Sequence, residues 1–468
     1  MITKKTGYDT DTICAISTAP GRGAIAMIRI SGKDAFAIAD KVFEPFAQDA
    51  RLTDQKGYTM HYGNLSDGDE IIDAVVAGVF RAPNSYTCED VVEFSCHGSP
   101  YIQQRIMETL ITAGARVAEP GEFTLRAFLN GRIDLSQAEA VADLIASTSK
   151  ASHEVAMKQM RGGFSQKIEK LRQQLVDFAA LLELEMDFSE EDVEFANRAQ
   201  LRELLDDLKS EIKQLIDSFR LGNVLKHGIP VAIVGKPNVG KSTLLNALLN
   251  EERAIVSEIP GTTRDSIEDV ISIRGFAFRF IDTAGLRDTI DTVENIGIER
   301  TREKMEQAAI ILYLFDLNNF SVEELNETIK NLNQQYGDQD KRIILIGNKT
   351  DLLVEIPHNF NELVEHETIF VSAKRKENIN LIVDSLLRSV EHGDLDSDVL
   401  VSNARHLQAL QQALKFVESI EEGFTINLST DLIAVDIRHA LHHLGTITGK
   451  ITTDEILGNI FGKFCIGK

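Results

Sequence analysis

The sequence has few features of a secreted, metal-stabilised or membrane-spanning protein. Its four cysteines, Cys14, Cys88, Cys96 and Cys465, form no CxxC pair, so we expect neither a disulfide framework nor a zinc knuckle. The start of the chain holds no apolar stretch, and a secretory signal is therefore not expected. The most apolar run, Ala308 to Phe315, is too short to cross a bilayer. These absences predict a reduced, cytoplasmic protein without membrane association.

Basic residues are also scarce. The 468 residues include 49 Lys and Arg against 72 Asp and Glu, which gives a net charge of −23. A chain this acidic has no general affinity for polyanions, so any contact with nucleic acid requires a local basic patch or a partner. Hydrophobic residues make up 43%, as in ordinary globular proteins. At roughly 150 residues per domain, the length predicts about three domains.

Four segments differ in their pattern of apolar residues. Residues 1–125 mix short strand-like runs with helical stretches, which predicts an α+β domain. Residues 126–225 follow a helical period, and residues 389–468 return to it. Residues 226–388 alternate apolar strands with helices, the pattern of a mostly parallel α/β sheet. Since the terminal segment is too short for a domain of its own, we predict a multidomain α+β and α/β chain whose α/β domain is inserted into a helical domain.

The inserted segment carries a phosphate-binding motif. Residues Gly235 to Ser242 read GKPNVGKS and fit G-x-x-x-x-G-K-[ST], with a strand before them and a helix, Thr243–Leu249, after them. In such a loop the glycines let backbone N–H groups wrap the phosphates. Lys241 reaches the β- and γ-phosphate oxygens, and the Ser242 hydroxyl ligates Mg²⁺. The strand, the loop and the helix agree, so we predict a nucleotide site here.

Three shorter motifs follow in the order expected of a GTP site. DTAG begins at Asp282, at the end of a strand, where a carboxylate can hold the Mg²⁺ shell. NKTD ends at Asp351, whose carboxylate can accept two hydrogen bonds from the N1–H and N2–H₂ edge of guanine. Adenine lacks that donor pair, and sites of this kind discriminate by ~10⁴ or more. The third motif, SAK, begins at Ser372 and can close the base pocket with its backbone. The residues expected to bind GTP are Asn238, Val239, Gly240, Lys241, Ser242, Thr243, Ser257, Glu258, Ile259, Pro260, Gly261, Thr262, Thr263, Asp282, Thr283, Ala284, Gly285, Asn348, Lys349, Asp351, Ser372, Ala373 and Lys374.

The segment GTTRD predicts a nucleotide-dependent switch. Its Thr263 can complete the Mg²⁺ shell beside Ser242 in the GTP state and release it after hydrolysis. After DTAG stands Leu286, where Ras-like proteins carry the Gln that orients the attacking water. Leucine cannot do this, so another group is needed. Asp288, Asp291 and Glu294 lie just downstream and are candidates.

These motifs carry a resemblance to known families. The segments GKPNVGKST, PGTTRD, DTAGLR and NKTD resemble translation-associated GTPases of the Era type. Three further segments, APGRGAIAMIRISG, PGEFTLRAFLNGRIDLSQAEAVADLI and the terminal FCIGK, resemble the MnmE (TrmE) family of tRNA-modifying GTPases. The likeness covers essentially the whole chain, including the insertion of the GTP-binding domain into a helical domain.

The resemblance implies a function and a set of partners. It implies a homodimer formed through the amino-terminal domain, which is similar to tetrahydrofolate-binding aminomethyltransferase modules. It also implies a heterotetramer with MnmG, which uses FAD and NADH. Together such proteins add an aminomethyl or carboxymethylaminomethyl group to carbon 5 of the wobble uridine of certain tRNAs. A tetrahydrofolate derivative, in its 5,10-methylene or 5-formyl form, supplies the one-carbon unit.

The resemblance also implies a potassium ion and a catalytic residue in the GTP site. Asn238 matches the family's K⁺ ligand, and Ser257, Ile259 and Thr262 match the loop that completes the coordination. A monovalent cation there would stabilise the transition state in the place of an arginine finger. Glu294 matches the family's water-orienting glutamate and is the expected catalytic residue.

In the outer segments the resemblance points to folate. Arg29, Glu93, Arg132 and Lys468 match the folate-contacting positions. Basic groups suit the glutamyl carboxylates of folate, and one carboxylate suits the N–H edge of the pterin. Some relatives carry Lys in place of Arg132, which keeps the charge but changes the geometry. Cys465 matches the family's terminal cysteine. It is either a thiol with a chemical role or an incidental one.

Three local patterns leave alternatives open. Ser136 and Glu139 fit a helix capping box. Lys150 to Arg172 holds six basic residues against two acidic ones, and is either a solvated helix face or a helix facing tRNA. His439, His442 and His443 are spaced for one helix face, which favours a solvated or tRNA-facing surface over a metal site.

Two other functions fit parts of the sequence. A regulatory GTPase that binds ribosome or RNA without modification chemistry would explain the Era-like motifs. It gives no reason for the FCIGK end. A membrane-signalling GTPase has less support, because the chain has no CaaX box, no myristoylation start and no polybasic tail.

Overall fold

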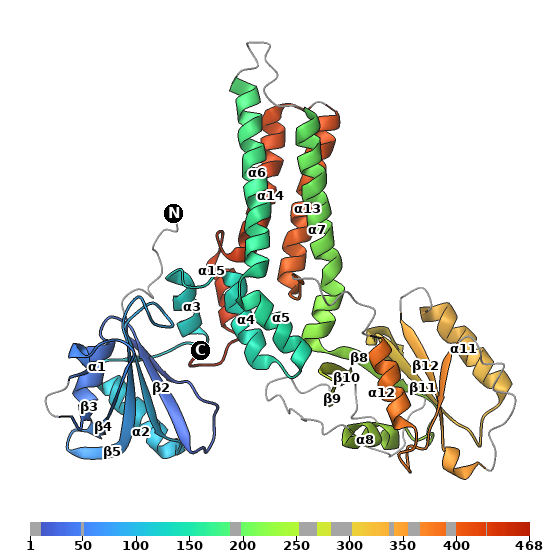
Figure 1. The fold of residues 1–468 in the computed structure, drawn as a ribbon, viewed down its shortest axis with the longest axis horizontal. Helices are drawn as coiled ribbons and strands as arrows, with labels where there is room; N and C mark the ends of the chain where they lie inside the picture. Colours follow the sequence, from blue (N-terminus) through green and yellow to red (C-terminus); the bar gives the residue numbers. More distant parts are fainter. Residues whose placement is uncertain are drawn as a thin grey trace. The chain divides into compact units, whose positions relative to one another are not determined.

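The computed structural model describes residues 11–47, 51–187, 198–251, 269–281, 302–336, 341–353, 366–389, 399–426 and 428–468. The chain forms two compact units. Figure 1 shows their helices and strands, coloured from the amino to the carboxyl end of the chain. The first joins Met1–Ala142 to Leu444–Lys468, and the second is Asp143–His443. The predicted fold class, with an α+β amino-terminal domain, a helical domain and an inserted α/β domain, is confirmed. The predicted bounds of the four segments stay a prediction.

The first unit contains a seven-stranded sheet with two helices packed together on one of its faces. Its neighbouring strands are antiparallel except for the parallel pair of β1 and β7. Helices α1 (Ala35–Val42) and α2 (Pro100–Ala113) bury Ile38, Ile106 and Leu110 against the sheet. In sheet order the strands are β3 (Phe43–Pro45), β4 (Thr59–Asp67), β5 (Glu70–Phe80), β6 (Val91–His97), β2 (Ile25–Ser31), β1 (Ile13–Ile16) and β7 (Arg116–Val117).

The terminal segment of the chain packs against the amino-terminal part of this unit. Helices α3 (Glu122–Leu129), α4 (Leu135–Ala146) and α15 (Asp454–Phe461) share a core that includes Phe128, Leu135, Phe461 and Phe464. Gly121 has a φ of 67°, and a Cβ there would lie 2.7 Å from the carbonyl oxygen of Phe461. Glycine therefore lets the two ends of the unit approach each other.

A buried ionic network lies beside this contact. Glu122 is 1% exposed and accepts from Arg116 at 2.7 Å and from Arg126 at 2.9 Å. Arg126 also pairs with Glu89 at 3.1 Å. Burial by itself would raise the pKa of Glu122, but the hydrogen bonds from the two arginines and from the backbone of Glu119 outweigh it and lower the pKa.

Helices from before and after the inserted domain pack together in the second unit. Lys209 and Lys213 of α7 pair with Glu421 and Glu418 of α13. Figure 1 shows these long helices running alongside one another. The helices of this part are α5 (Lys150–Met160), α6 (Gly163–Asp187), α7 (Arg198–His227), α13 (Ala404–Thr425) and α14 (Thr430–Thr448).

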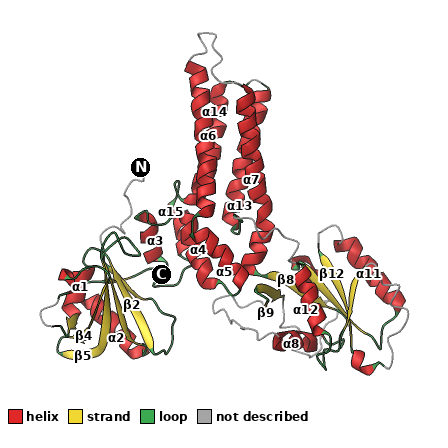
Figure 2. Cartoon of the chain, in the orientation of Figure 1, coloured by secondary structure: helices red, strands yellow, loops and turns green. Residues whose placement is uncertain are grey.

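The inserted domain is a six-stranded sheet covered on both faces (Figure 2). Only the edge strand β9 is antiparallel to its neighbour. Helices α8 (Lys241–Glu251) and α12 (Ile379–Arg388) share one apolar core with the sheet, and α11 (Val322–Tyr336) shares another. In sheet order the strands are β13 (Glu367–Phe370), β12 (Arg342–Asn348), β11 (Ile310–Asp316), β8 (Ile229–Val234), β10 (Phe276–Phe280) and β9 (Asp269–Ile273).

Two local predictions were wrong. The capping box of α4 is formed by Asp134 and Gln137, whose side chains exchange hydrogen bonds with each other's backbone N–H, and not by Ser136 and Glu139. The predicted pair, Ser136 and Glu139, lies inside the helix because α4 begins at Leu135. The basic run is not one helix: it is split between α5 and α6 at Gly162, whose φ is 84°.

We predict that Glu122→Gln destabilises the first unit by about 3 kcal/mol at pH 7, because it leaves Arg126 without its buried partner. The measurement is hydrogen exchange of peptides over residues 116–128 at increasing urea. Glu70→Gln is the matched control. Glu70 pairs with Arg105 but is 65% exposed, so this change should cost no more than about 1 kcal/mol.

The contribution of Glu122 to the stability of the first unit should depend on pH. Folding lowers the pKa of Glu122 from 4.5, so its stabilisation is complete well above that pH and is lost as the pH falls through the folded value. The difference between wild type and Glu122→Gln should therefore shrink in acid. A difference that is constant from pH 7 to pH 3 would contradict the proposed charge network.

Candidate functional site

The phosphate-binding motif forms a tight loop between β8 and α8. Gly235, Asn238 and Gly240 have φ of 151°, 61° and 100°. A Cβ at Gly235 would overlap the carbonyl oxygen of Leu314, and one at Gly240 would overlap the side-chain amide of Asn348. The two glycines are therefore required by close packing as well as by conformation. The loop ends at the first turn of α8, where helix N–H groups suit an anion.

Lys241 lies across this loop. Its ammonium donates to the carbonyl oxygens of Gly235 at 2.8 Å and Lys236 at 2.9 Å. Burial, followed by the charge of Lys304, lowers the pKa of Lys241. Ser242 and Thr243 follow Lys241 in the first turn of α8, so all three residues lie at the helix N-terminus. These groups can bind phosphates and can supply one ligand to Mg²⁺.

Asn348 connects the three loops of the site. It is the last residue of β12, and it is 2% exposed. Its side-chain N–H donates to the carbonyl oxygen of Val239 at 2.8 Å, and its side-chain oxygen accepts from the backbone N–H of Ala373 at 3.0 Å. One amide thus fixes the phosphate loop, NKTD and SAK relative to one another. The predicted proximity of these described segments is observed.

Asp351 is held by a residue of the neighbouring loop. It lies in the short helix η4 (Thr350–Leu352), and its Oδ1 accepts from the hydroxyl of Ser372 at 2.7 Å. The same Ser372 oxygen accepts from the backbone N–H of Arg375 at 3.1 Å. The Ser372 hydrogen bond is the main cause that lowers the pKa of Asp351. The carboxylate is therefore ionised and oriented, as an acceptor for the guanine edge must be.

A second acidic residue lies at this edge of the sheet and was not predicted from the sequence. Asp316 ends β11, is 8% exposed, and pairs with Lys349 of NKTD at 2.7 Å. Burial alone would raise its pKa, but the hydrogen bonds from Lys349 and Asn318 outweigh it and lower the pKa. A signal was present, since an apolar strand that ends in an acid on the carboxyl edge of a parallel sheet is a ligand-site pattern. A cavity of about 250 Å³ lies here, between the phosphate loop, β11 and α11.

Several predicted site residues lie outside the described residues. They include all residues from the switch segment and from DTAG, and with them most of the expected Mg²⁺ and K⁺ ligands and the expected catalytic glutamate. These are Ser257, Glu258, Ile259, Pro260, Gly261, Thr262, Thr263, Asp282, Thr283, Ala284, Gly285 and Glu294.

A second candidate site lies in the amino-terminal sheet. The strand register sets Arg29 of β2 opposite Glu93 of β6, and the two side chains pair at 2.8 Å. The Arg29 and Arg132 guanidinium groups lie 5.3 and 5.8 Å from the ring centre of Tyr86. Tyr86, Glu93 and Arg132 line a cavity of about 300 Å³ with Tyr58 and other residues. The structure thus brings three of the four predicted folate residues together.

The chain terminus lies in the same unit. The carbonyl oxygen of Gly467 accepts from the hydroxyl of Ser17 at 3.0 Å, and Ile466 bridges to Pro120. Lys468 is partly exposed and is not among the residues lining the cavity. Cys465 is exposed.

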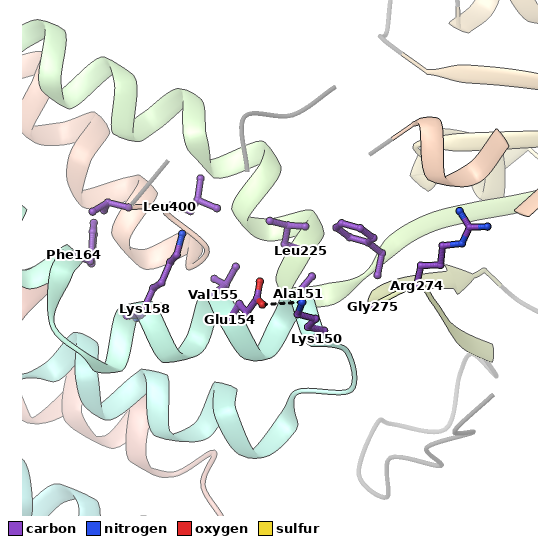
Figure 3. A pocket seen from close by; sticks show the side chains of 13 residues that line it. Lys150, Ala151, Glu154, Val155, Lys158, Phe164, Leu225, Arg274, Gly275 and Leu400 are labelled. Atoms are coloured by element: carbon purple, nitrogen blue, oxygen red, sulfur yellow. Dashed lines mark ion pairs between the residues drawn. The ribbon is translucent and has the colours of Figure 1, made fainter. Parts of the chain in front are cut away.

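Figure 3 shows a further cavity, of about 170 Å³, in the second unit. It lies between α5, α7 and the turn of the β9–β10 hairpin, where the backbone N–H of Ala151 donates to the carbonyl oxygen of Gly275 at 2.9 Å. None of the GTP-site motif residues that the structure describes lines it. Lys150 at its rim pairs with Glu154, and Lys167 and Lys170 of α6 pair with Glu211. Three lysines of the predicted basic run therefore have acidic partners within the chain.

The histidines of α14 are engaged in ring contacts. His439 and His443 stack on Phe416 with ring centres 4.9 and 5.6 Å apart. Burial, followed by the charges of the neighbouring histidines, lowers the pKa of His443. In the part of the chain that the structure describes, no group of three His, Cys, Asp or Glu residues could hold a metal ion. Over the same residues, no helix is both long enough and apolar enough to span a membrane.

Two protein-family models together match most of the chain. Residues 135–465 match the model of the MnmE helical domain, and residues 12–132 match that of the GTP-binding protein TrmE N-terminus. A solved structure, the G domain of the T. maritima FeoB iron transporter, aligns with 34% of this chain and 97% of its own at 23% identity, with a TM-score of 0.26. That value is too low to support any argument.

Curated relatives match along their full length. The tRNA modification GTPase MnmE of Christiangramia forsetii is 54% identical over 98% of this chain and 99% of the relative. Proteins of the same name from Cytophaga hutchinsonii and Bacteroides fragilis strain NCTC 9343 are 50% and 49% identical, over 100% and 98% of this chain and 100% and 99% of the relatives. The resemblance carried by the motifs is confirmed: this chain belongs to the MnmE family of tRNA modification GTPases.

Proposed function

We propose that this chain binds and hydrolyses GTP and takes part in tRNA modification. The observation that carries the proposal is the side chain of Asn348, which holds the phosphate loop and the two base-pocket loops together at one edge of the sheet. A ligand with both a phosphate chain and a base would contact all three loops at once. The ionised Asp351 beside Ser372 selects guanine as that base.

Each residue of the site then has a defined part in GTP binding. Backbone N–H groups of the phosphate loop and Lys241 bind the phosphates, while Ser242, with Thr263, holds Mg²⁺. Mg²⁺ supplies charge that stabilises the transferring phosphoryl group. Asp351 accepts from the base, and Ser372, Ala373 and Lys374 close the pocket around it.

The proposal extends to potassium and to the water nucleophile. Asn238, with its left-handed φ of 61°, would bind K⁺ with Ser257, Ile259 and Thr262. The family resemblance supports this assignment. Glu294 would orient the attacking water, since Leu286 cannot.

For the modification itself, we propose that the cavity beside Tyr86 holds a tetrahydrofolate derivative. Arg132 lines this cavity, and Arg29 lies near the same Tyr86 ring, so both can pair with the glutamyl carboxylates. Glu93, oriented by Arg29, can accept from the pterin. Lys468 and Cys465 belong to this proposal by resemblance alone. As a cytoplasmic homodimer joined to MnmG, which brings FAD and NADH, the chain would add an aminomethyl or carboxymethylaminomethyl group to the wobble uridine.

The main alternative is a regulatory GTPase without modification chemistry. The GTP site fits both functions equally well. The cavity lined by Arg132 and by Glu93, which pairs with Arg29, has no role in the regulatory alternative, and therefore favours the modification enzyme.

We predict that Asp351→Asn lowers the affinity for GDP by at least 100-fold and raises the affinity for xanthosine diphosphate. Asparagine offers an N–H donor where guanine also donates, whereas xanthine presents a carbonyl. Titration with fluorescent analogues of both nucleotides measures the change. Lys374→Ala is the control, because SAK is expected to act through its backbone. Equal GDP affinity in Asp351→Asn and wild type would contradict the base assignment.

A second prediction concerns potassium. GTP turnover should be several-fold faster in KCl than in NaCl, because K⁺ adds positive charge beside the transferring phosphoryl group. Asn238→Ala should abolish that difference, and steady-state phosphate release measures it. The same rate in both salts would exclude the cation from the reaction.

The function as a whole is tested by mass spectrometry of nucleosides from total tRNA of the source organism, with and without this gene. Loss of the gene should remove 5-aminomethyl-type wobble uridines, and the intact gene should restore them. Lys241→Ala should fail to restore them because phosphate binding is lost. Arg132→Ala should fail while keeping GTP turnover. An unchanged nucleoside profile, with no second copy of the gene, would support the regulatory alternative.

A further inference from the structure

The end of β11 is joined to NKTD by three separate contacts. The backbone N–H of Leu317 donates to the carbonyl oxygen of Asn348 at 3.1 Å. The ammonium of Lys349 donates to Oδ2 of Asp316 at 2.7 Å. The side-chain amide of Asn318 reaches the carbonyl oxygen of Lys349 at 3.5 Å. Both ends of Lys349, its ammonium and its carbonyl, are thus held by one short segment.

Lys349 needs such support because of its backbone. Its φ of 71° is left-handed, a conformation that a lysine rarely adopts and that persists only where the surroundings fix it. The next residues form η4, which carries Asp351. A change in the conformation of Lys349 would therefore move the carboxylate that accepts from the base.

The two oxygens of Asp316 have different partners. Oδ1 accepts from the backbone N–H of Asn318 at 3.0 Å and from its side-chain amide at 3.1 Å, which fixes the local turn. Oδ2 faces Lys349 alone among the hydrogen bonds described. The side chain of Asp316 is 10% exposed, so solvent screens this ion pair far less than a surface pair.

From this geometry we infer that Asp316 is a positioning residue for guanine nucleotide binding, acting through the ammonium of Lys349. The inference rests on the proposed function and extends it to a residue outside the four motifs. Asp316 does not contact the nucleotide in this account. It holds Lys349, and through Lys349 the turn that presents Asp351. Its loss should weaken nucleotide binding and leave the chemical step unchanged.

The test is the affinity for fluorescent GDP and the steady-state kinetics of GTP hydrolysis in the full-length chain. In Asp316→Asn, an amide oxygen can still accept from Asn318, so the local turn is kept while the charge facing Lys349 is lost. The dissociation constant for GDP and the KM for GTP should rise about tenfold, the effect of about 1.4 kcal/mol. At saturating GTP, kcat should stay within about twofold of wild type.

A matched control lies in the same cavity. Glu324 of α11 pairs with Lys236 at 2.6 Å, but both side chains are more than 60% exposed. Glu324→Gln should leave GDP affinity unchanged, because exposed ion pairs contribute little. Similar losses in both variants would indicate a general effect of charge near the phosphates and would overturn the inference.

A double-mutant cycle separates positioning from a purely structural role. Lys349→Met keeps the aliphatic stem and removes the ammonium. If Asp316 acts through that ammonium, Asp316→Asn should add no further loss of GDP affinity in the Lys349→Met background. Losses that multiply would overturn the inference, as would unchanged GDP affinity in Asp316→Asn. A wild-type chain that fails to bind GDP would instead overturn the proposed function and this inference together.

Discussion

The side chain of Asn348 is the contact on which the GTP site depends. The phosphate loop, NKTD and SAK follow three different strands, and sheet pairing alone fixes only where each strand ends. One buried amide donates to Val239 and accepts from Ala373, so the three loops hold a single arrangement. Since both partners are backbone groups, the link does not depend on which side chains the outer loops carry. A buried amide with both groups satisfied also avoids the cost of an unpaired polar group.

Around this contact the backbone is held in unusual conformations. Asn238, Lys349 and Asn378 are non-glycine residues with positive φ, and each belongs to a loop at or beside the site. Such conformations are unfavourable in isolation and are found where packing and hydrogen bonds enforce them. Here Asp316 and Asn318 hold Lys349, while Gly235 and Gly240 allow the phosphate loop to approach β11 and Asn348. These contacts hold the described loops of the site in one arrangement, which reduces the ordering that binding requires.

The amino-terminal unit is assembled from two parts that are more than 300 residues apart in the chain. Contacts between these two parts must therefore hold it together. An aromatic core joins Phe128 to Phe461 and Phe464, and Gly121 leaves room for the terminal segment. The buried pair of Glu122 and Arg126 fixes the start of α3 in the same region. The proposed folate cavity is formed by strands and loops of this unit, so the family's terminal FCIGK segment and the cavity belong to one folded body.

By itself the sequence determined the fold class, the nucleotide motif and the family. Buried parallel strands such as β8, β11 and β12 are continuous apolar runs, and the phosphate loop is a local motif with fixed spacing, so both can be read without knowing what packs against them. Only the tertiary structure decided which polar side chains meet. Asp316 and Lys349 are 33 residues apart, and Arg29 and Glu93 are 64 apart, and each pair is set by strand order or register. The capping box of α4 was misassigned for a related reason: Ser136 and Glu139 fit the local pattern, but α4 begins at Leu135, so the box is formed two residues earlier by Asp134 and Gln137.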